Sequence, residues 1–163
     1  MNKLRNDLLA IVRAALAAVD AGPLVRAAFA MPDVDGVVRA ARAVDAIAVG
    51  KAAAAMLTAA AAAAPVRLRH LVGAAADEAG HVPAGARWYT TTHPVPDERS
   101  VIAARDVLEV AHAADERDLL VVLLSGGASA ILALPAEGVT LADKQRTSKR
   151  LLDLGTEIHE FNT

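Results

Sequence analysis

Residues 118–124 read Asp-Leu-Leu-Val-Val-Leu-Leu, and residues 125–129 continue as Ser-Gly-Gly-Ala-Ser. An uninterrupted apolar run of this length is typical of a strand buried on both faces inside a parallel sheet. Two glycines between two hydroxyls let the backbone turn and present consecutive N–H groups to an anion, although a glycine pair also serves simply to turn the chain. The candidate phosphate-binding or nucleotide-binding residues of this loop are Ser125, Gly126, Gly127, Ala128 and Ser129.

Strands and helices are expected to alternate along the rest of the chain. Apolar and β-branched composition predicts strands over residues 43–49, 68–72 and 87–92. Helical periodicity, caps and alanine content predict helices over residues 4–19, 23–31, 52–64, 97–115 and 141–154, with residues 33–36 interpreted as a turn. This alternation predicts one α/β domain over residues 1–163, a Rossmann-like three-layer sandwich with a mostly parallel sheet. Ligands of such sheets bind outside the carboxyl ends of the strands, so we expect the chemistry after residues 49, 92 and 124.

Lys51 follows Gly50 directly after the expected strand over residues 43–49. A cation at the start of a helix is unfavourable by up to ~1 kcal/mol, because the exposed N–H groups already make that end positive. A bound phosphate or carboxylate would remove the conflict. Lys51 is also one of only four lysines, against thirteen arginines. We therefore take Gly50 and Lys51 as anion-binding candidates, the alternative being a solvated lysine at a frayed helix start.

A His-Pro-Val-Pro-Asp segment follows the third expected strand, at residues 93–97. Each proline excludes the α region for the residue before it, which holds His93 and Val95 extended. His93 is thereby displayed at a strand end, and Asp97 suits the N-cap of the next helix. His93 and Asp97 are candidates for a substrate cleft; the alternative is a sharp strand-to-helix connection without further function.

Composition excludes several classes of function. A formal net charge of −2, the lack of a basic cluster and 2% aromatic residues argue against a nucleic-acid partner. The chain has no cysteine, and the spacing of its five histidines does not suggest a metal site, so no metal ligands are predicted. Residues 52–66 are too short and too weakly apolar to span a membrane, and charged residues within residues 1–18 argue against a signal peptide. We expect a cytoplasmic protein without a membrane partner.

Taken in order, four segments resemble the N-terminal domain of the glycerate 2-kinase family, whose members are sometimes labelled hydroxypyruvate reductase. The matching segments are AIAVGKAAAAM (46–56), THPVPDERS (92–100), LLSGGASAILALPAEGVTLADK (123–144) and LLDLGTEIHEFNT (151–163). The resemblance implies ATP-dependent phosphorylation of D-glycerate to 2-phosphoglycerate, with ATP and Mg²⁺ as cofactors, in a cleft between two α/β domains.

The resemblance also implies roles for particular residues. Lys51 stands where the family has its catalytic lysine, and residues 125–129 stand where it has a glycine-rich phosphate loop. Residues 93–97 match its His-Pro-x-Pro-Asp segment, and the last matching segment adds Glu160 and Asn162 to the substrate-cleft candidates. One departure concerns the loop, because Ala128 replaces a glycine that the family more usually has.

The second departure is the length of the chain. In the family, the segment that resembles residues 159–163 leads into a second domain, which supplies further active-site residues including an arginine. We therefore expect this chain to carry part of a kinase site, to be inactive or nearly so alone, and to associate with itself or with a complementing C-terminal domain chain. The alternatives are a non-catalytic remnant, one half of a split enzyme, and a hydroxypyruvate reductase, although no spaced-glycine dinucleotide fingerprint is present.

Overall fold

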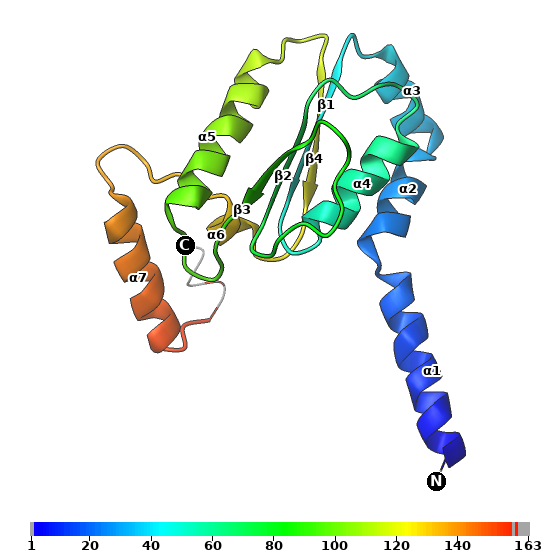
Figure 1. The fold of residues 1–163 in the computed structure, drawn as a ribbon, viewed down its shortest axis with the longest axis horizontal. Coiled ribbons are helices and arrows are strands. Elements are labelled where there is room, and N and C mark those ends of the chain that lie inside the picture. Colours follow the sequence, from blue (N-terminus) through cyan, green and yellow to red (C-terminus); the bar gives the residue numbers. More distant parts are fainter. Residues whose placement is uncertain (1, 158, 160–163) are drawn as a thin grey trace.

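Four parallel strands form the central sheet of the computed structural model, which describes residues 2–157 and 159 (Figure 1). The strands are β1 (Val44–Val49), β2 (Leu71–Ala75), β3 (Arg87–Thr90) and β4 (Leu119–Leu124), in the order β3-β2-β1-β4. Every pairing is parallel, with Val49 opposite Ala74 on one side and Leu124 on the other. The expected α/β architecture is confirmed, and within the described residues the sheet is entirely rather than mostly parallel.

Helices cover both faces of this sheet. They are α1 (Asn2–Ala18), α2 (Ala21–Phe29), α3 (Pro32–Ala40), α4 (Ala53–Ala63), α5 (Glu98–Ala113), α6 (Ala128–Ile131) and α7 (Leu141–Asp153). Figure 1 shows α2, α3 and α4 on one side of the sheet and α5 on the other, which makes the three layers. Successive side chains of β1 point to opposite faces, so Ala46 and Ala48 pack in the core below α4, and Ile47 and Val49 pack in the core below α5.

Two segments differ from the sequence-based expectation. Residues 33–36 are not a turn but part of α3. Pro32 is the first residue of this helix, a position that suits proline. Asp33 and Asp35 lie in its first turn, where carboxylates interact favourably with the helix dipole. The second strand runs three residues later than expected, over Leu71–Ala75. Its Gly73 lies against the Trp88 ring of β3, where a Cβ would come within 2.4 Å of the ring, so strand packing fixes this position.

The strand expected to be buried on both faces is an edge strand instead. β4 pairs with β1 on one side only, and its Val122 and Leu124 side chains are 50% and 65% exposed. The apolar run at residues 118–124 therefore predicted the strand correctly, but the expected burial on both faces was wrong. The physical reason is lateral position: α5 packs beside β3 at the opposite edge of the sheet, and the α5-side face of β4 is left exposed by the described residues.

Helix α1 extends away from the sheet (Figure 1), and its amphipathic pattern is not buried by the described residues. Leu4, Leu8, Ile11 and Leu16 are each more than half exposed. No single helix within residues 2–157 and 159 is long and apolar enough to span a membrane. Within these residues, one pair of helices reaches that length and composition when taken together, Lys3–Ala18 with Ala21–Phe29, and this pair is bent by 43° at its break.

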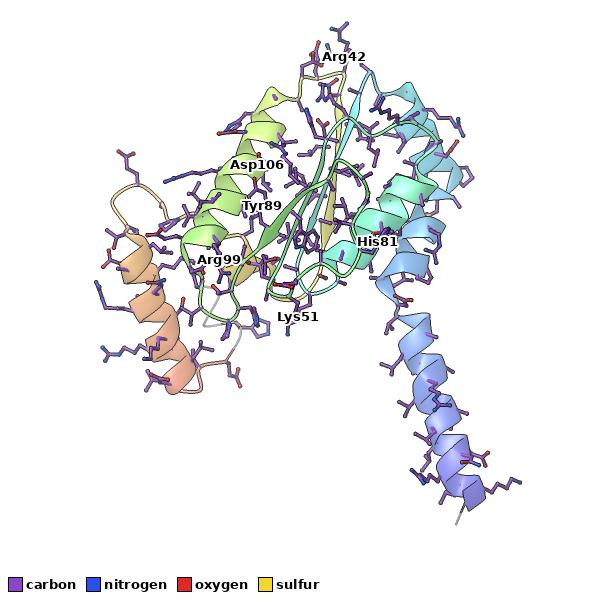
Figure 2. All side chains as sticks on the ribbon, in the orientation of Figure 1. Arg42, Lys51, His81, Tyr89, Arg99 and Asp106 are labelled. Atoms are coloured by element: carbon purple, nitrogen blue, oxygen red, sulfur yellow. The ribbon has the colours of Figure 1, made fainter. Side chains whose placement is uncertain are left out.

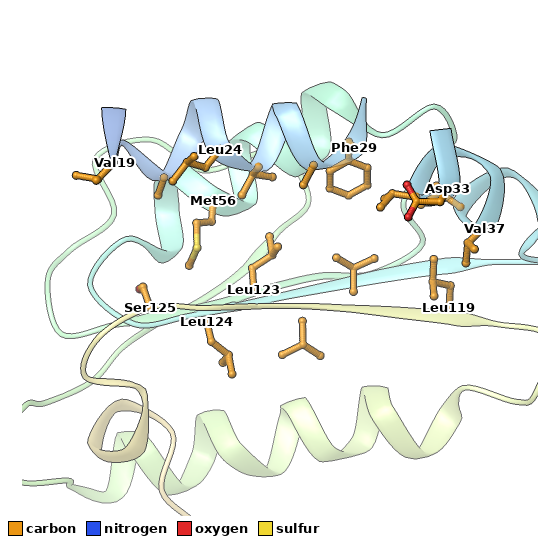
Figure 3. A pocket seen from close by; sticks show the side chains of 17 residues that line it. Val19, Leu24, Phe29, Asp33, Val37, Met56, Leu119, Leu123, Leu124 and Ser125 are labelled. Atoms are coloured by element: carbon orange, nitrogen blue, oxygen red, sulfur yellow. The ribbon is translucent and has the colours of Figure 1, made fainter. Parts of the chain in front are cut away.

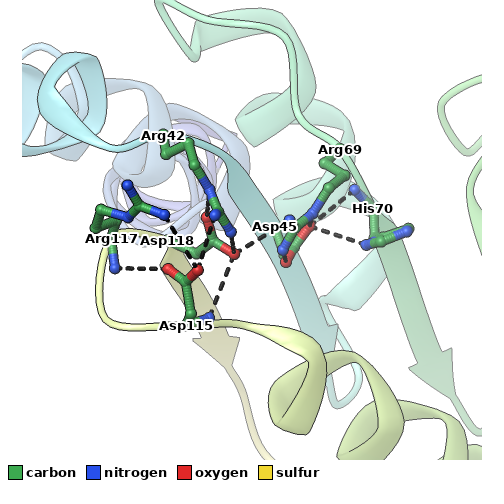
Figure 4. Close-up of polar contacts among 7 residues, drawn as sticks. All are labelled: Arg42, Asp45, Arg69, His70, Asp115, Arg117 and Asp118. Atoms are coloured by element: carbon green, nitrogen blue, oxygen red, sulfur yellow. Dashed lines mark hydrogen bonds and ion pairs between the residues drawn. The ribbon is translucent and has the colours of Figure 1, made fainter.

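A network of ion pairs closes the end of the sheet opposite the strand carboxyl ends (Figure 4). The buried Asp45 carboxylate accepts hydrogen bonds from Arg69 and from the His70 amide, while Asp118 binds both Arg42 and Arg69. The hydrogen bond from Arg42 lowers the pKa of Asp118 to about 2 against the opposing effect of burial. These contacts join the starts of β1, β2 and β4 and leave the other end of the sheet for the candidate site.

Candidate functional site

The turn after β1 brings Lys51 to the carboxyl end of the sheet (Figure 2). Gly50 has φ +114°, a conformation that side chains other than glycine rarely adopt, and a Cβ on it would lie 2.4 Å from Ser125 Oγ. Glycine is thus required at position 50 by the positive φ and by the close approach of Ser125, which follows β4. Lys51 is exposed and lies in the turn just before α4, not in its first helical turn as expected.

The loop after β4 is hydrogen-bonded directly to this turn. The Lys51 amide donates to the Gly126 carbonyl at 3.0 Å, and the Ala52 amide donates to Ser125 Oγ at 3.0 Å. The Ser125 amide donates to the Val49 carbonyl at 2.9 Å. Two segments 73 or more residues apart in the sequence therefore form one joined turn, and the two strongest anion-binding candidates of the sequence lie side by side.

Gly127 gives the loop its left-handed residue and its contact with His93. Its φ is +91°, and a Cβ on it would lie 2.9 Å from His93 Cδ2 and 3.2 Å from Nε2. His93 follows β3 and Gly127 follows β4, and these two strands form opposite edges of the sheet. The segments after both strands nevertheless meet at the carboxyl end of the sheet, where His93 lies beside Gly127. All three expected strand ends thus meet at one place.

Ala128 fits the loop although the family more usually has glycine there. Among the described residues only glycines have positive φ, and Ala128 begins α6 with helical backbone. Helix α6 starts directly at the loop, and the amides of Ala130 and Ile131 donate to the Gly127 carbonyl. The first amides of a helix have no acceptor inside the helix, and in α6 these are the amides of Ala128 and Ser129.

Asp97 has a structural task within the His-Pro-Val-Pro-Asp segment. It is the N-cap of α5, and its carboxylate accepts hydrogen bonds from the amides of Arg99 and Ser100 and from Arg99 Nε at 2.8 Å. Burial alone would raise the pKa of Asp97, but the hydrogen bonds from Arg99 and Ser100 outweigh it and hold the pKa below its usual range. Ser100 Oγ accepts from the Asp97 amide and completes a capping box.

Two further contacts lie near the site. Gln145 of α7 donates from Nε2 to the Pro96 carbonyl at 2.9 Å and so attaches α7 to the segment that carries His93. Arg99 is an exposed cation held by Asp97 at the same edge (Figure 2). Arg99 belongs to the matching segment over residues 92–100, whereas the contact of Gln145 carried no signal in the sequence, because it depends on how distant elements pack. The substrate-cleft candidates Glu160 and Asn162 lie outside the described residues.

An apolar groove of about 690 Å³ lies beside the site, between α2, α3 and β4 (Figure 3). Phe29, Met56 and Leu123 line it, and Ser125 lies at one end. Its only charged lining residue is Asp33 among the described residues, so the groove does not suit a phosphate. Residues 2–157 and 159 also contain no group of three or more His, Asp or Glu side chains placed to hold a metal ion. The polar site is therefore the joined turn at residues 50–52 and 125–129.

Comparisons with known proteins give the family. Residues 7–163 match the family model described as Domain of unknown function (DUF4147). The glycerate 2-kinase of Pyrococcus horikoshii is 45% identical over 71 residues, which are 44% of this chain and 16% of that protein. The D-glycerate 2-kinase of Thermotoga maritima is 44% identical over 75 residues, 46% of this chain and 18% of that protein.

A solved structure agrees with these sequence matches. The crystal structure of a glycerate kinase from Thermotoga maritima superposes with a TM-score of 0.79 and 31% identity, covering 99% of this chain and 38% of that one. The chain therefore spans well under half the length of these relatives. It belongs to the DUF4147 family, and in sequence and structure it is similar to the N-terminal domain of the glycerate 2-kinases.

Proposed function

We propose that this chain supplies the anion-binding half of a site that phosphorylates D-glycerate to 2-phosphoglycerate with ATP. The observation that carries the proposal is the hydrogen-bonded junction of two loops, in which the Lys51 amide lies 3.0 Å from the Gly126 carbonyl. It joins a lysine to a glycine-rich loop at the carboxyl ends of parallel strands, where ligands of such sheets bind. The names of the relatives support glycerate as the substrate.

The chemistry of phosphoryl transfer fits these groups. The bond between the β–γ bridging oxygen and the γ-phosphorus breaks, and a bond from the C2 hydroxyl oxygen to that phosphorus forms. The hydroxyl proton is released to solvent, and ADP leaves with the electron pair of the broken bond. Catalysis consists chiefly of holding the reactants in line and neutralising phosphate charge. Lys51 supplies a positive charge, and the amides of Ala128 and Ser129 supply donors. His93, packed on Gly127, borders the same space and is the proposed contact for the substrate.

Mg²⁺ fits these residues less well than the phosphates do. It prefers oxygen ligands from carboxylates, waters and nucleotide phosphates, whereas the groups gathered at the joined turn are a lysine, amides and hydroxyls. The nearby Asp97 carboxylate is already engaged by Arg99 and by the amides of α5. Within the described residues no carboxylate set holds the ion. We therefore assign no metal ligand and route no step through Mg²⁺.

The chain covers 38% of the glycerate kinase structure that it matches. We propose that it binds ATP phosphates but is inactive, or nearly so, without a complementing domain.

Selective labelling of lysine tests the proposed site. Pyridoxal phosphate carries an aldehyde that reacts with amines and a phosphate that seeks the same anion site, and borohydride reduction fixes the product for mass spectrometry. We expect Lys51 to be labelled first and to be protected by ATP, because its backbone is hydrogen-bonded to the loop. Lys3 on α1 and Lys149 on α7 are internal controls, and both are exposed. Equal labelling of all four lysines, with no protection by ATP, would refute the site.

A further inference from the structure

Ser125 lies at the centre of the joined turn, and its hydroxyl has two partners within the protein. Ser125 Oγ accepts a hydrogen bond from the Ala52 amide at 3.0 Å and donates to the Val49 carbonyl at 3.4 Å. Val49 is the last residue of β1, and Ala52 is the N-cap of α4. One side chain from the end of β4 therefore holds both ends of the turn that contains Lys51.

The proton count of this hydroxyl argues against a direct contact with phosphate. A serine hydroxyl has one proton to donate and two lone pairs that accept. Phosphate oxygens are acceptors, so a hydroxyl binds them by donating that proton. At 3.4 Å from the Val49 carbonyl oxygen, Ser125 Oγ is placed to donate its proton there, while one of its lone pairs accepts from the Ala52 amide. Binding phosphate through Ser125 would break the hydrogen bond to Val49.

The same turn is held from its other side. The Lys51 amide donates to the Gly126 carbonyl at 3.0 Å, and Gly50 approaches Ser125 so closely that a Cβ would lie 2.5 Å from the Ser125 carbonyl oxygen. Three consecutive residues, Gly50 to Ala52, are thus in contact with Ser125 or Gly126. The Lys51 side chain is exposed, so its direction is set by its backbone and not by packing of its stem.

We infer that Ser125 is a positioning residue, which fixes the turn so that Lys51 meets the anion, and that it is not itself a phosphate ligand. The inference rests on the proposed function for the role of Lys51, whereas the hydrogen-bond geometry stands without it. Ser129, the other hydroxyl of the loop, is exposed and lies on the side of α6, which leaves it as the hydroxyl available to a ligand. The two serines of one motif therefore have different tasks.

The test compares Ser125→Ala, Ser125→Thr and Ser129→Ala in the 163-residue chain. The first readout is the hydrogen-exchange rate of the Ala52 amide by NMR, and the second is ATP affinity by calorimetry. Loss of a hydrogen bond worth about 1 kcal/mol predicts roughly fivefold faster exchange of the Ala52 amide in Ser125→Ala, with weaker ATP binding. Ser125→Thr keeps the hydroxyl and is expected to restore both values. Ser129→Ala is expected to weaken ATP binding without changing Ala52 exchange.

Several outcomes would overturn the inference. Unchanged Ala52 exchange in Ser125→Ala, whatever the affinity, would mean that the hydroxyl does not hold the turn. Faster exchange of all protected amides, with a lowered melting temperature that Thr does not rescue, would mean a general loss of stability. If the unsubstituted chain does not bind ATP, the proposed function fails, while a local rise in Ala52 exchange would still support the positioning role.

Discussion

At the scale of single residues, glycines at the strand ends account for much of the site. Sequence patterns predicted Gly50 and Gly127 as phosphate-loop residues, and the structure adds the reason why glycine stands there. Each has positive φ, and each is approached by another segment, Gly50 by Ser125 and Gly127 by His93. The loop accommodates Ala128 where the family more usually has glycine, because the left-handed conformation falls one residue earlier, at Gly127. The sequence could not reveal this, since it gives no dihedral angles.

The Gly50→Ala variant tests the packing reason. We expect it to destabilise the fold by about 2–6 kcal/mol, because an unfavourable φ costs roughly 1–3 kcal/mol and overpacking costs a similar amount. Gly126→Ala is the matched control, since φ is not positive there and a Cβ would meet nothing within 4 Å. Urea unfolding followed by circular dichroism measures both. Equal stability of the two variants would mean that the turn at Gly50 adapts to a side chain.

At the scale of elements, local signals predicted helix ends well and burial poorly. Helix α7 begins at the Thr140 capping box with Asp143 and ends before Gly155, as expected, because caps are formed by neighbours in the sequence. The two-sided burial expected of β4 was wrong, because burial depends on which strand lies at the edge. The amphipathic α1 was predicted as a helix, but the described residues do not cover its apolar side.

These exposed elements predict association in solution. The apolar side of α1 and the exposed face of β4 carry large apolar side chains that the described residues leave uncovered. Contiguous exposed apolar surface is typical of interaction sites. We expect sedimentation velocity to report species heavier than the 16.8 kDa chain, and the double variant Leu8→Glu, Leu16→Glu to shift them toward the monomer. Both leucines are exposed, at 54% and 64%, so the change leaves the core intact. Arg5→Glu is the control outside the apolar stripe. A monodisperse wild-type monomer would refute this expectation.

At the scale of the whole molecule, a simple rule predicted much of the site. The carboxyl ends of parallel strands share one edge, so the segments after β1, β3 and β4 were expected to meet, and Lys51, His93 and the loop at residues 125–129 do lie there. The rule could not predict the pairing of Ser125 with Ala52 or of Gln145 with Pro96, since these depend on side-chain packing between distant elements.

We propose that this chain binds ATP through Lys51 but does not complete phosphoryl transfer alone. Calorimetric titration of ATP in the presence of D-glycerate measures both parts, because binding heat saturates whereas turnover heat continues. We predict saturable binding without sustained heat, weakened about 10- to 100-fold in Lys51→Ala through loss of a charged hydrogen bond, and unchanged in the control Lys3→Ala. Sustained heat from the chain alone, or equal binding by Lys51→Ala, would contradict the account.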